Sequence, residues 1–301
     1  LKDKLAAAQP YGQWTQKVVD LNSLLRDIPE VQTFTGGELR KRQIAAGFTL
    51  EELEQVLAPM AEDGKEMVAS MGDDTPPAVL SAQYRPLSHY FRQNFSQVTN
   101  PPIDSLREGR VMSLKTRFGN LRNVLDENNS QSEILVLESP FIANREFEVM
   151  VDRFGDQVAF IDCSFPVGEG LDDLRVGLER IRAEAEDAVR SGAGQLVLTD
   201  EHQGPERVGM PMILATSAVH SWLTRKGLRT FCSINVRSAE CIDPHYFAVL
   251  IGCGATTVNA YLAQDSIADR IDRGLLDGTL TDAMRRYRDA IDAGLLKIMS
   301  K

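Results

Sequence analysis

A glycine-containing stretch near the C-terminal end, residues 252–261 (GCGATTVNAY), has the composition of a phosphate-binding turn. In β/α barrels, backbone N–H groups after the last two strands hold a phosphate, often on glycines at a helix start. The preceding strand should then deliver glycines, but it continues into Arg237 and Ser238, and Asn259 and Tyr261 follow the last strand. Only part of the glycine pattern of a phosphate site is therefore present, so a structural turn is the favoured interpretation. Arg237 could still hold an anion, and the GxG spacing completes no dinucleotide fingerprint.

Histidines and cysteines, the usual bases, nucleophiles and metal ligands, are scattered along the chain. They are His89, His202, His220 and His245, and Cys163, Cys232, Cys241 and Cys253. His220 lies within an apolar helical pattern, which is typical of a structural histidine, and His245 falls in the first turn of a helix, which favours the neutral ring. The cysteines lie in apolar settings without zinc-ligand spacing, so we expect buried, inert thiols.

Pairs of neighbouring carboxylates, such as Asp73–Asp74, Asp172–Asp173 and Asp200–Glu201, are candidates for acid–base chemistry. Neighbours on a helix or strand point apart, so we expect a solvated surface for these pairs. Asp73–Asp74 differs in lying in a short turn between a glycine and a Thr-Pro step. No catalytic, cofactor-binding or metal-binding residue is therefore assigned in this chain.

Charge and composition narrow the classes of partner. The chain has 301 residues, a formal net charge of -10 and 43% hydrophobic residues, typical of a globular domain. Nucleic acid and anionic membranes need clustered Lys and Arg, so neither is an expected partner. No apolar run has the length of a membrane span, and a cytoplasmic location is expected. A start at Leu1 suggests a processed or excised fragment.

The first 130 residues are predicted to be helical and loop-like. Thr49 and Glu52 form a capping box that opens an amphipathic helix, and Pro59 should end this helix before Met60. A second helix is expected around residues 87–95. Residues 97–104 should be extended because of their two prolines, and residues 126–131 should form an exposed loop.

From residue 134 the pattern alternates between short apolar strands and amphipathic helices. Strands are predicted at residues 134–137, 158–161, 196–199, 229–236 and 256–258. Helices are predicted at residues 171–189, 211–226, 266–273 and 280–299, the first two ending at Gly192 and Gly227. This spacing predicts an α/β fold with mainly parallel strands, a partly degenerate β/α-barrel-like domain preceded by a helical or loop connecting region. It has no assembled active site, which favours a structural or channelling role.

A series of ordered motifs resembles one family, the central domain of the large subunit of glutamate synthase, between its amidotransferase and flavin-binding domains. The motifs are LRKRQ (39–43), GFT (47–49), APMA (58–61), GKE (64–66), MGDDTP (71–76), AVLS (78–81), RPL (85–87), YFRQ (90–93), QVTNPPID (97–104), LRE (106–108), VMSL (111–114), GLLDG (274–278) and GLLKIMSK (294–301). The resemblance covers nearly the whole chain and is looser between residues 128 and 207.

The resemblance implies that residues 1–70 are a connecting segment after the amidotransferase domain and that residues 71–301 are the central α/β domain. The parent enzyme would make two glutamates from glutamine and 2-oxoglutarate, with FMN and a 3Fe-4S cluster outside this fragment. The implied partners are the adjacent amidotransferase and FMN-binding domains of the same chain, with an electron-donating small subunit also possible. Ferredoxin and nicotinamide remain open as electron sources. The fragment itself would be inactive.

The central domain of this family holds the two catalytic domains in register and helps to wall an ammonia passage. Met71, Thr75, Thr99 and Asn100 belong to stretches that resemble the tunnel region, and neutral side chains suit a passage in which ammonia must stay unprotonated. The simpler alternative is that both stretches are Pro-stabilised connectors. Two further readings stay open: a free-standing flavin- or phosphate-binding β/α protein, and a subunit-docking module acting through residues 1–70.

Overall fold

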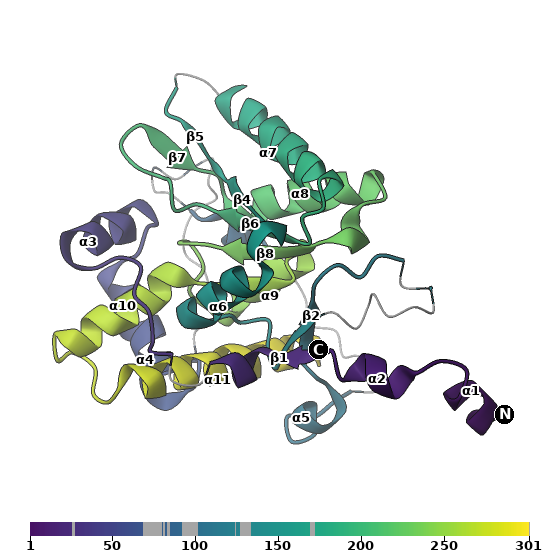
Figure 1. Ribbon diagram of the computed structural model, residues 1–301. Coiled ribbons are helices and arrows are strands. Elements are labelled where there is room, and N and C mark those ends of the chain that lie inside the picture. Colours follow the sequence, from purple (N-terminus) through teal and green to yellow (C-terminus); the bar gives the residue numbers. More distant parts are fainter. Residues whose placement is uncertain are drawn as a thin grey trace.

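The computed structural model describes residues 1–25, 28–68, 80, 82, 85–91, 102–123, 125–126, 134–168 and 172–300. Its elements form an α/β fold around a sheet of parallel strands (Figure 1). Two short helices, α1 (Lys2–Ala6) and α2 (Tyr11–Thr15), bury none of their residues and project from the body in Figure 1. The chain then enters the body through β1 (Val19–Asp20) and the 3-10 helix η1 (Leu21–Leu24).

The capping box predicted at Thr49 is present. The Thr49 hydroxyl accepts a hydrogen bond from the Glu52 backbone N–H at 3.1 Å, and Glu52 accepts one from the Thr49 backbone N–H at 2.7 Å. The predicted end before Met60 is wrong, because the π-helix η2 (Glu52–Leu57) continues into α4 (Ala58–Asp63). Pro59 is near the start of α4, where a missing N–H costs least, and Gly64 ends the helix at φ 66°.

The predicted helix at residues 87–95 is also shorter than expected. Residues Leu87–Tyr90 form the 3-10 helix η4, Phe91 is non-helical, and residues 92–95 lie outside the described residues. Pro86 is the extended N-cap of η4 and sets its start. Farther along are α5 (Glu108–Val111) and β2 (Thr116–Phe118). The stretch expected to be extended, 97–104, and the expected loop, 126–131, are described only in part.

The central sheet has the strand order β4-β6-β8-β9, with every neighbour parallel. Its strands are β4 (Val158–Asp162), β6 (Gln195–Thr199), β8 (Ser233–Arg237) and β9 (Thr257–Asn259). In the register of the sheet, Val197 pairs with Phe160 on one side and with Asn235 on the other. The parallel α/β prediction is therefore confirmed.

Helices alternate with these strands. They are α6 (Asn144–Phe154), α7 (Asp172–Arg190), α8 (Met212–Arg225), α9 (Pro244–Gly252), α10 (Tyr261–Asp272) and α11 (Leu280–Met299). The apolar stripe predicted on α7 is buried at Ile181, Ala185 and Val189, and the one on α11 is buried through Leu295, whereas Met299 is 54% exposed. Thus α7, α8 and α11 follow their predicted bounds closely, and α10 begins five residues before its predicted start.

Two predicted strands are placed differently. Residues Arg229–Phe231 form the 3-10 helix η7, so the strand expected at 229–236 begins only at Ser233. The strand expected at 134–137 is β3 (Leu135–Leu137), which belongs to a second sheet of order β1-β3-β2, parallel to β1 and antiparallel to β2. Apolar periodicity indicates a strand but carries no information on which sheet it joins.

The segment that follows β3 joins the central sheet at its β9 edge. Ile142 donates its backbone N–H to Val258 at 3.0 Å, and Val258 donates to Pro140 at 2.8 Å, forming a parallel bridge next to β9. At the other edge, β4 pairs only with β6 among the described residues. The arrangement is thus an open sheet rather than a closed barrel in the described part of the chain.

The two faces of the central sheet differ in polarity. Leu196, Leu198 and Ile234 point into the main core, which also includes Leu57 and Tyr287. The opposite face carries buried polar side chains: Gln195, Thr199, Ser233, Asn235, Arg237, Thr257 and Asn259. The predicted division between residues 70 and 71 lies outside the described residues and stays a prediction.

Candidate functional site

The carboxyl edge of the central sheet holds a buried ion pair. Arg237, the last residue of β8, lies 2.8 Å from the Glu201 carboxylate (Nε to Oε2) just beyond β6. Its guanidinium also donates to Asn259 Oδ1 at 2.6 Å and to Thr33 Oγ1 at 2.8 Å. Arg237 is only 6% exposed. The anion that Arg237 could hold is therefore a carboxylate of the same chain.

Two further side chains extend this network. Asn259 donates to Asn144 Oδ1 at 3.0 Å, and Asn144 donates to Asp265 Oδ1 at 3.2 Å. The Asp265 carboxylate accepts the backbone N–H groups of Thr33 at 3.0 Å and Phe34 at 2.9 Å. Burial raises the pKa of Asp265 to about 6, although these two N–H groups oppose the rise. Asp265 thus fastens residues 33–34 over the edge of the sheet.

Asp200 is buried under the same edge, at 2% exposure. It accepts hydrogen bonds from the Ala239 backbone N–H at 2.8 Å and from the Tyr261 hydroxyl at 3.0 Å. Burial raises the pKa of Asp200 to about 7, and the neighbouring carboxylate of Glu240 raises it further. The solvated surface expected for Asp200–Glu201 is therefore wrong, because the strand that precedes this pair ends inside the molecule.

Helix α3 (Gly36–Ala45) covers this edge. Arg42 donates to the Glu201 carbonyl oxygen at 2.8 Å, and Gln43 donates to the Ser266 hydroxyl at 2.8 Å. Leu39 packs with Ala239, Tyr261 and Leu262 in a small separate core. In open α/β sheets the carboxyl edge is the usual place for a ligand. Here side chains of the same chain occupy most of it.

The glycines first considered for phosphate binding lie at the opposite edge. Cys253 caps the C-terminal end of α9, and Gly254 adopts φ 114° in the turn that precedes β9. The stretch is thus a structural turn, as predicted. Since Arg237 is already paired and Gly254 lies beyond the other end of the strands, these residues do not fit a single bound phosphate group.

The histidines and cysteines are not brought together into one site. His220 accepts a hydrogen bond from Arg229 Nε at 3.1 Å, and desolvation lowers its pKa, with the nearby guanidinium adding to the effect. His245, in the first turn of α9 as predicted, hydrogen-bonds through Nε2 to the Ser88 carbonyl oxygen at 2.9 Å. No group of three His, Cys, Asp or Glu residues in the described ranges is arranged to hold a metal ion.

Three of the cysteines are buried, as predicted: Cys163, Cys232 and Cys241. Cys253 differs, being only partly buried because it lies in the surface turn after α9. Burial raises the pKa of every one of these thiols, that of Cys232 to about 11. The thiols are therefore poor nucleophiles at neutral pH.

A cleft of about 870 Å³ opens beside the buried edge. Its walls are the C-terminal half of α3 and the ribbon formed by β5 (Ser164–Pro166) and β7 (Arg207–Gly209), which lie on the same side of the molecule in Figure 1. Asp200 and Glu240 also line it. Sequence patterns gave no signal for this cleft, because its walls are more than 110 residues apart and it forms only in the folded chain.

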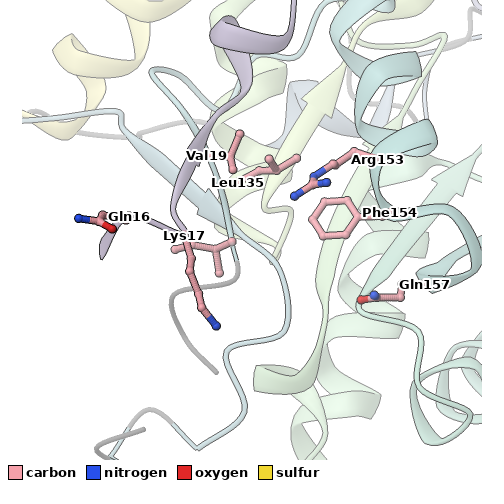
Figure 2. A pocket seen from close by; sticks show the side chains of 8 residues that line it. Gln16, Lys17, Val19, Leu135, Arg153, Phe154 and Gln157 are labelled. Carbon is pink, nitrogen blue, oxygen red and sulfur yellow. The ribbon is translucent and has the colours of Figure 1, made fainter. Parts of the chain in front are cut away.

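A second hollow of about 570 Å³ lies between β1, the start of β3 and the end of α6. In Figure 2, Arg153 and Phe154 point from α6 toward Val19 and Leu135, while Gln16 turns away. Its charged lining residues are Lys17 and Arg153.

The four residues predicted for an ammonia passage, Met71, Thr75, Thr99 and Asn100, all lie outside the described residues, as does Asp73–Asp74. The structure therefore leaves this hypothesis untested. In the part of the chain that the structure describes, no helix combines the length and apolarity needed to cross a bilayer.

Comparison with known proteins gives a consistent result. Residues 41–301 match the family model described as the glutamate synthase central domain. The chain is 58% identical over 305 residues to the large chain of a glutamate synthase [NADPH] from Azospirillum brasilense, which it covers to 20%. It is 36% identical to a glutamate synthase [NADH] from Schizosaccharomyces pombe and to ferredoxin-dependent glutamate synthase 2 from Arabidopsis thaliana, covering 15% and 19% of them. In each comparison all of this chain is matched, so it spans about a fifth or less of these relatives.

Proposed function

The chain belongs to the family of glutamate synthase central domains, and on that premise we propose that it is a non-catalytic part of such an enzyme. It holds an amidotransferase domain and a flavin-binding synthase domain of the same polypeptide in register. Residues 1–70 serve as the connecting segment and residues 71–301 as the central α/β domain. Limited proteolysis should then cut near residue 70, and a first cut within residues 172–300 would contradict this division.

One observation supports the non-catalytic role most directly. At the carboxyl edge of the sheet, the guanidinium of Arg237 is engaged by Glu201, Asn259 and Thr33 of the same chain. A catalytic site in such a fold would instead present these groups to a ligand. The simplest test is to assay the 301-residue chain for glutamine hydrolysis and for glutamate formation. Turnover of either substrate by the purified chain would overturn the proposal.

The parent enzyme is proposed to convert glutamine and 2-oxoglutarate into two glutamates in the cytoplasm, with FMN and a 3Fe-4S cluster bound outside this chain. The relatives' names specify NADPH, NADH or ferredoxin. The 58% identity to an NADPH enzyme favours a nicotinamide-linked donor. Its electrons would pass to the flavin through a small subunit. Assaying the full-length parent with NADPH, NADH and reduced ferredoxin distinguishes the donors.

The chain is further proposed to contribute to an ammonia passage through Met71, Thr75, Thr99 and Asn100. Neutral side chains suit this task, because an acid would convert ammonia into ammonium, which is costly to desolvate. Replacing Thr99 or Met71 by Trp in the full enzyme should uncouple glutamine hydrolysis from glutamate formation. If the two activities stay fully coupled in both variants, these residues are connectors only.

Two alternatives have their own tests. A free-standing flavin- or phosphate-binding protein would quench flavin fluorescence when FMN is titrated with the chain, and the paired state of Arg237 speaks against that outcome. A docking module would retain a separately produced amidotransferase domain in a pull-down through residues 1–70. The exposed helices α1 and α2, which bury no residue, are the feature that favours this second alternative.

A further inference from the structure

The 870 Å³ cleft between α3 and the β5–β7 ribbon combines apolar walls with an acidic floor. Ile44 and Val208 lie on opposite walls and are 71% and 45% exposed. Phe165 and Met210 extend the apolar surface inward. Clefts of this size, largely apolar and with a few convergent polar groups, are the usual form of a small-molecule site.

The cations around the cleft are mostly committed to other partners. Arg42 pairs with Glu38 at 3.1 Å and donates to the Glu201 carbonyl oxygen. Arg207 pairs with Asp162 at 2.8 Å and donates to the Ser164 hydroxyl at 2.8 Å. The remaining cation of the lining, Lys41, lies on the exposed side of α3. The cleft therefore offers little uncommitted positive charge to an anionic ligand.

The carboxylates at the floor of the cleft, unlike these cations, can still accept a hydrogen bond from a ligand. Glu240 Oε2 accepts hydrogen bonds from the Tyr246 hydroxyl and, at 3.1 Å, from the Met212 backbone N–H. Its second oxygen, Oε1, has no hydrogen-bond donor within the described ranges. Asp200 lies on the same floor, and burial raises the pKa of both carboxyl groups. A donor that brings positive charge would relieve this cost of burial.

We propose that this cleft binds an organic amine with an apolar body, whose ammonium group donates to Glu240 and whose body packs between Ile44 and Val208. Neither the central-domain role nor the ammonia passage requires such a site. The amine enters from the side of Lys41 and reaches the floor past Phe165 and Met210. An amine is favoured over a neutral alcohol of the same shape because only the amine neutralises the partly buried Glu240 carboxylate. It is favoured over a carboxylate because like charges repel.

The test uses three probes of matched shape: 2-phenylethylamine, 2-phenylethanol and 3-phenylpropionate. Each is titrated into the ¹⁵N-labelled 301-residue chain, and binding is followed by shifts of the backbone amide signals of the cleft. We expect the amine to bind roughly tenfold or more tightly than the alcohol, as one charge-assisted hydrogen bond implies, and the carboxylate to bind weakest. Equal affinity for all three probes, or no shift at the cleft with the amine, would overturn the proposal.

Three variants separate the site from general effects. Glu240→Gln should remove the preference for the amine and leave the affinity for the alcohol unchanged. Ala45→Trp, at an exposed position of the cleft wall, should block the amine and the alcohol alike. This variant keeps the test decisive if Glu240→Gln folds poorly. Glu179→Gln, at an exposed site on α7, should bind like the wild type. An amine preference that survives in both cleft variants would place its binding elsewhere and refute the assignment.

Discussion

Arg237 and Glu201 are 36 residues apart in the sequence, and their side chains meet at 2.8 Å where β6 and β8 end. Their side chains are 7% and 21% exposed, so water reaches neither charge freely. Each charge is therefore stabilised mainly by the other. The same guanidinium reaches Thr33, which ties the N-terminal segment to the sheet. The ion pair thus closes the edge at which an open α/β sheet commonly binds its ligand.

Breaking this pair from one side should be costly. Arg237→Met removes the cation and leaves the Glu201 carboxylate mostly buried and unpaired, so the free energy of unfolding should fall by about 3–5 kcal/mol. Urea denaturation followed by circular dichroism measures the loss. Arg175→Met, at an exposed pair with Glu179, should cost no more than about 0.5 kcal/mol. Equal losses in the two variants would show that the buried ion pair contributes no more to stability than the exposed one.

The double variant Arg237→Met/Glu201→Gln addresses the same network differently. With both charges gone, no unpaired carboxylate remains, and part of the stability lost in the single variant should return. A double variant that is less stable than Arg237→Met would mean that Glu201 has a second favourable role beyond pairing with Arg237. The Thr199 hydroxyl, which donates to Glu201 at 3.0 Å, would be the partner to consider.

Asp200 should make stability fall as pH rises. Its pKa is raised from 3.8 to about 7 in the folded chain, so between these values the folded state binds more protons than the unfolded state. The resulting stabilisation is complete below pH 3.8 and is lost as pH rises through 7. The difference is worth on the order of 4 kcal/mol, of which roughly 2–3 kcal/mol falls between pH 5 and pH 8.

Asp200 Oδ1 accepts from both the Ala239 N–H at 3.1 Å and the Tyr261 hydroxyl at 3.0 Å, so Asp200→Asn can keep one oxygen for both donors but cannot titrate. Between pH 5 and pH 8, its free energy of unfolding should therefore change less than that of the wild type, by the amount given above. Urea denaturation at four pH values measures both curves, with Asp172→Asn on the exposed start of α7 as the control. Parallel curves for wild type and Asp200→Asn would exclude a raised pKa at this site.

Local patterns predicted much of the fold. The stripes of α7 and α11 and the apolar runs of β4 and β6 follow from the spacing of apolar residues alone, because burial repeats with the period of each element. Helix ends at Gly192 and Gly227 were also predicted, since both residues adopt positive φ that other residues rarely accept.

The candidate site could not be predicted in the same way. Asp200 and Glu201 read as exposed neighbours, but residues far away in the sequence hold them inside the molecule. Ala239 and Tyr261 contact Asp200, and Arg42 and Arg237 contact Glu201. The prediction at Pro59 was wrong for a different, local reason: a π-helical turn before it lets the helical path continue, and the rule for proline assumes a regular helix. Long-range contacts decide the burial of Asp200 and Glu201, and a single sequence carries no direct signal for them.

Gly254 should tolerate no side chain. Its φ is 114°, and a Cβ there would overlap the imidazole ring of His220. Gly254→Ala should therefore lower the free energy of unfolding by about 1–3 kcal/mol, through backbone strain and displacement of the ring. Gly252→Ala is the matched control, because this residue ends α9 with open space around it and should be neutral or stabilising by up to about 1 kcal/mol. Thermal denaturation should show a clear fall of the Tm for Gly254→Ala, and no change or a small rise for Gly252→Ala.

Thiol reactivity tests the packing of the core and the one departure from the predicted burial of the cysteines. In the native chain at pH 8, Ellman's reagent should modify Cys253 alone, and slowly, because burial raises its pKa and favours the unreactive thiol. Cys163, Cys232 and Cys241 should react only in denaturant, since reagent cannot reach them in the folded core. Cys253→Ser should abolish native labelling, whereas Cys232→Ser should leave it unchanged. Rapid modification of two or more thiols in the native chain would mean that the sheet and its covering helices open far more often than this packing allows.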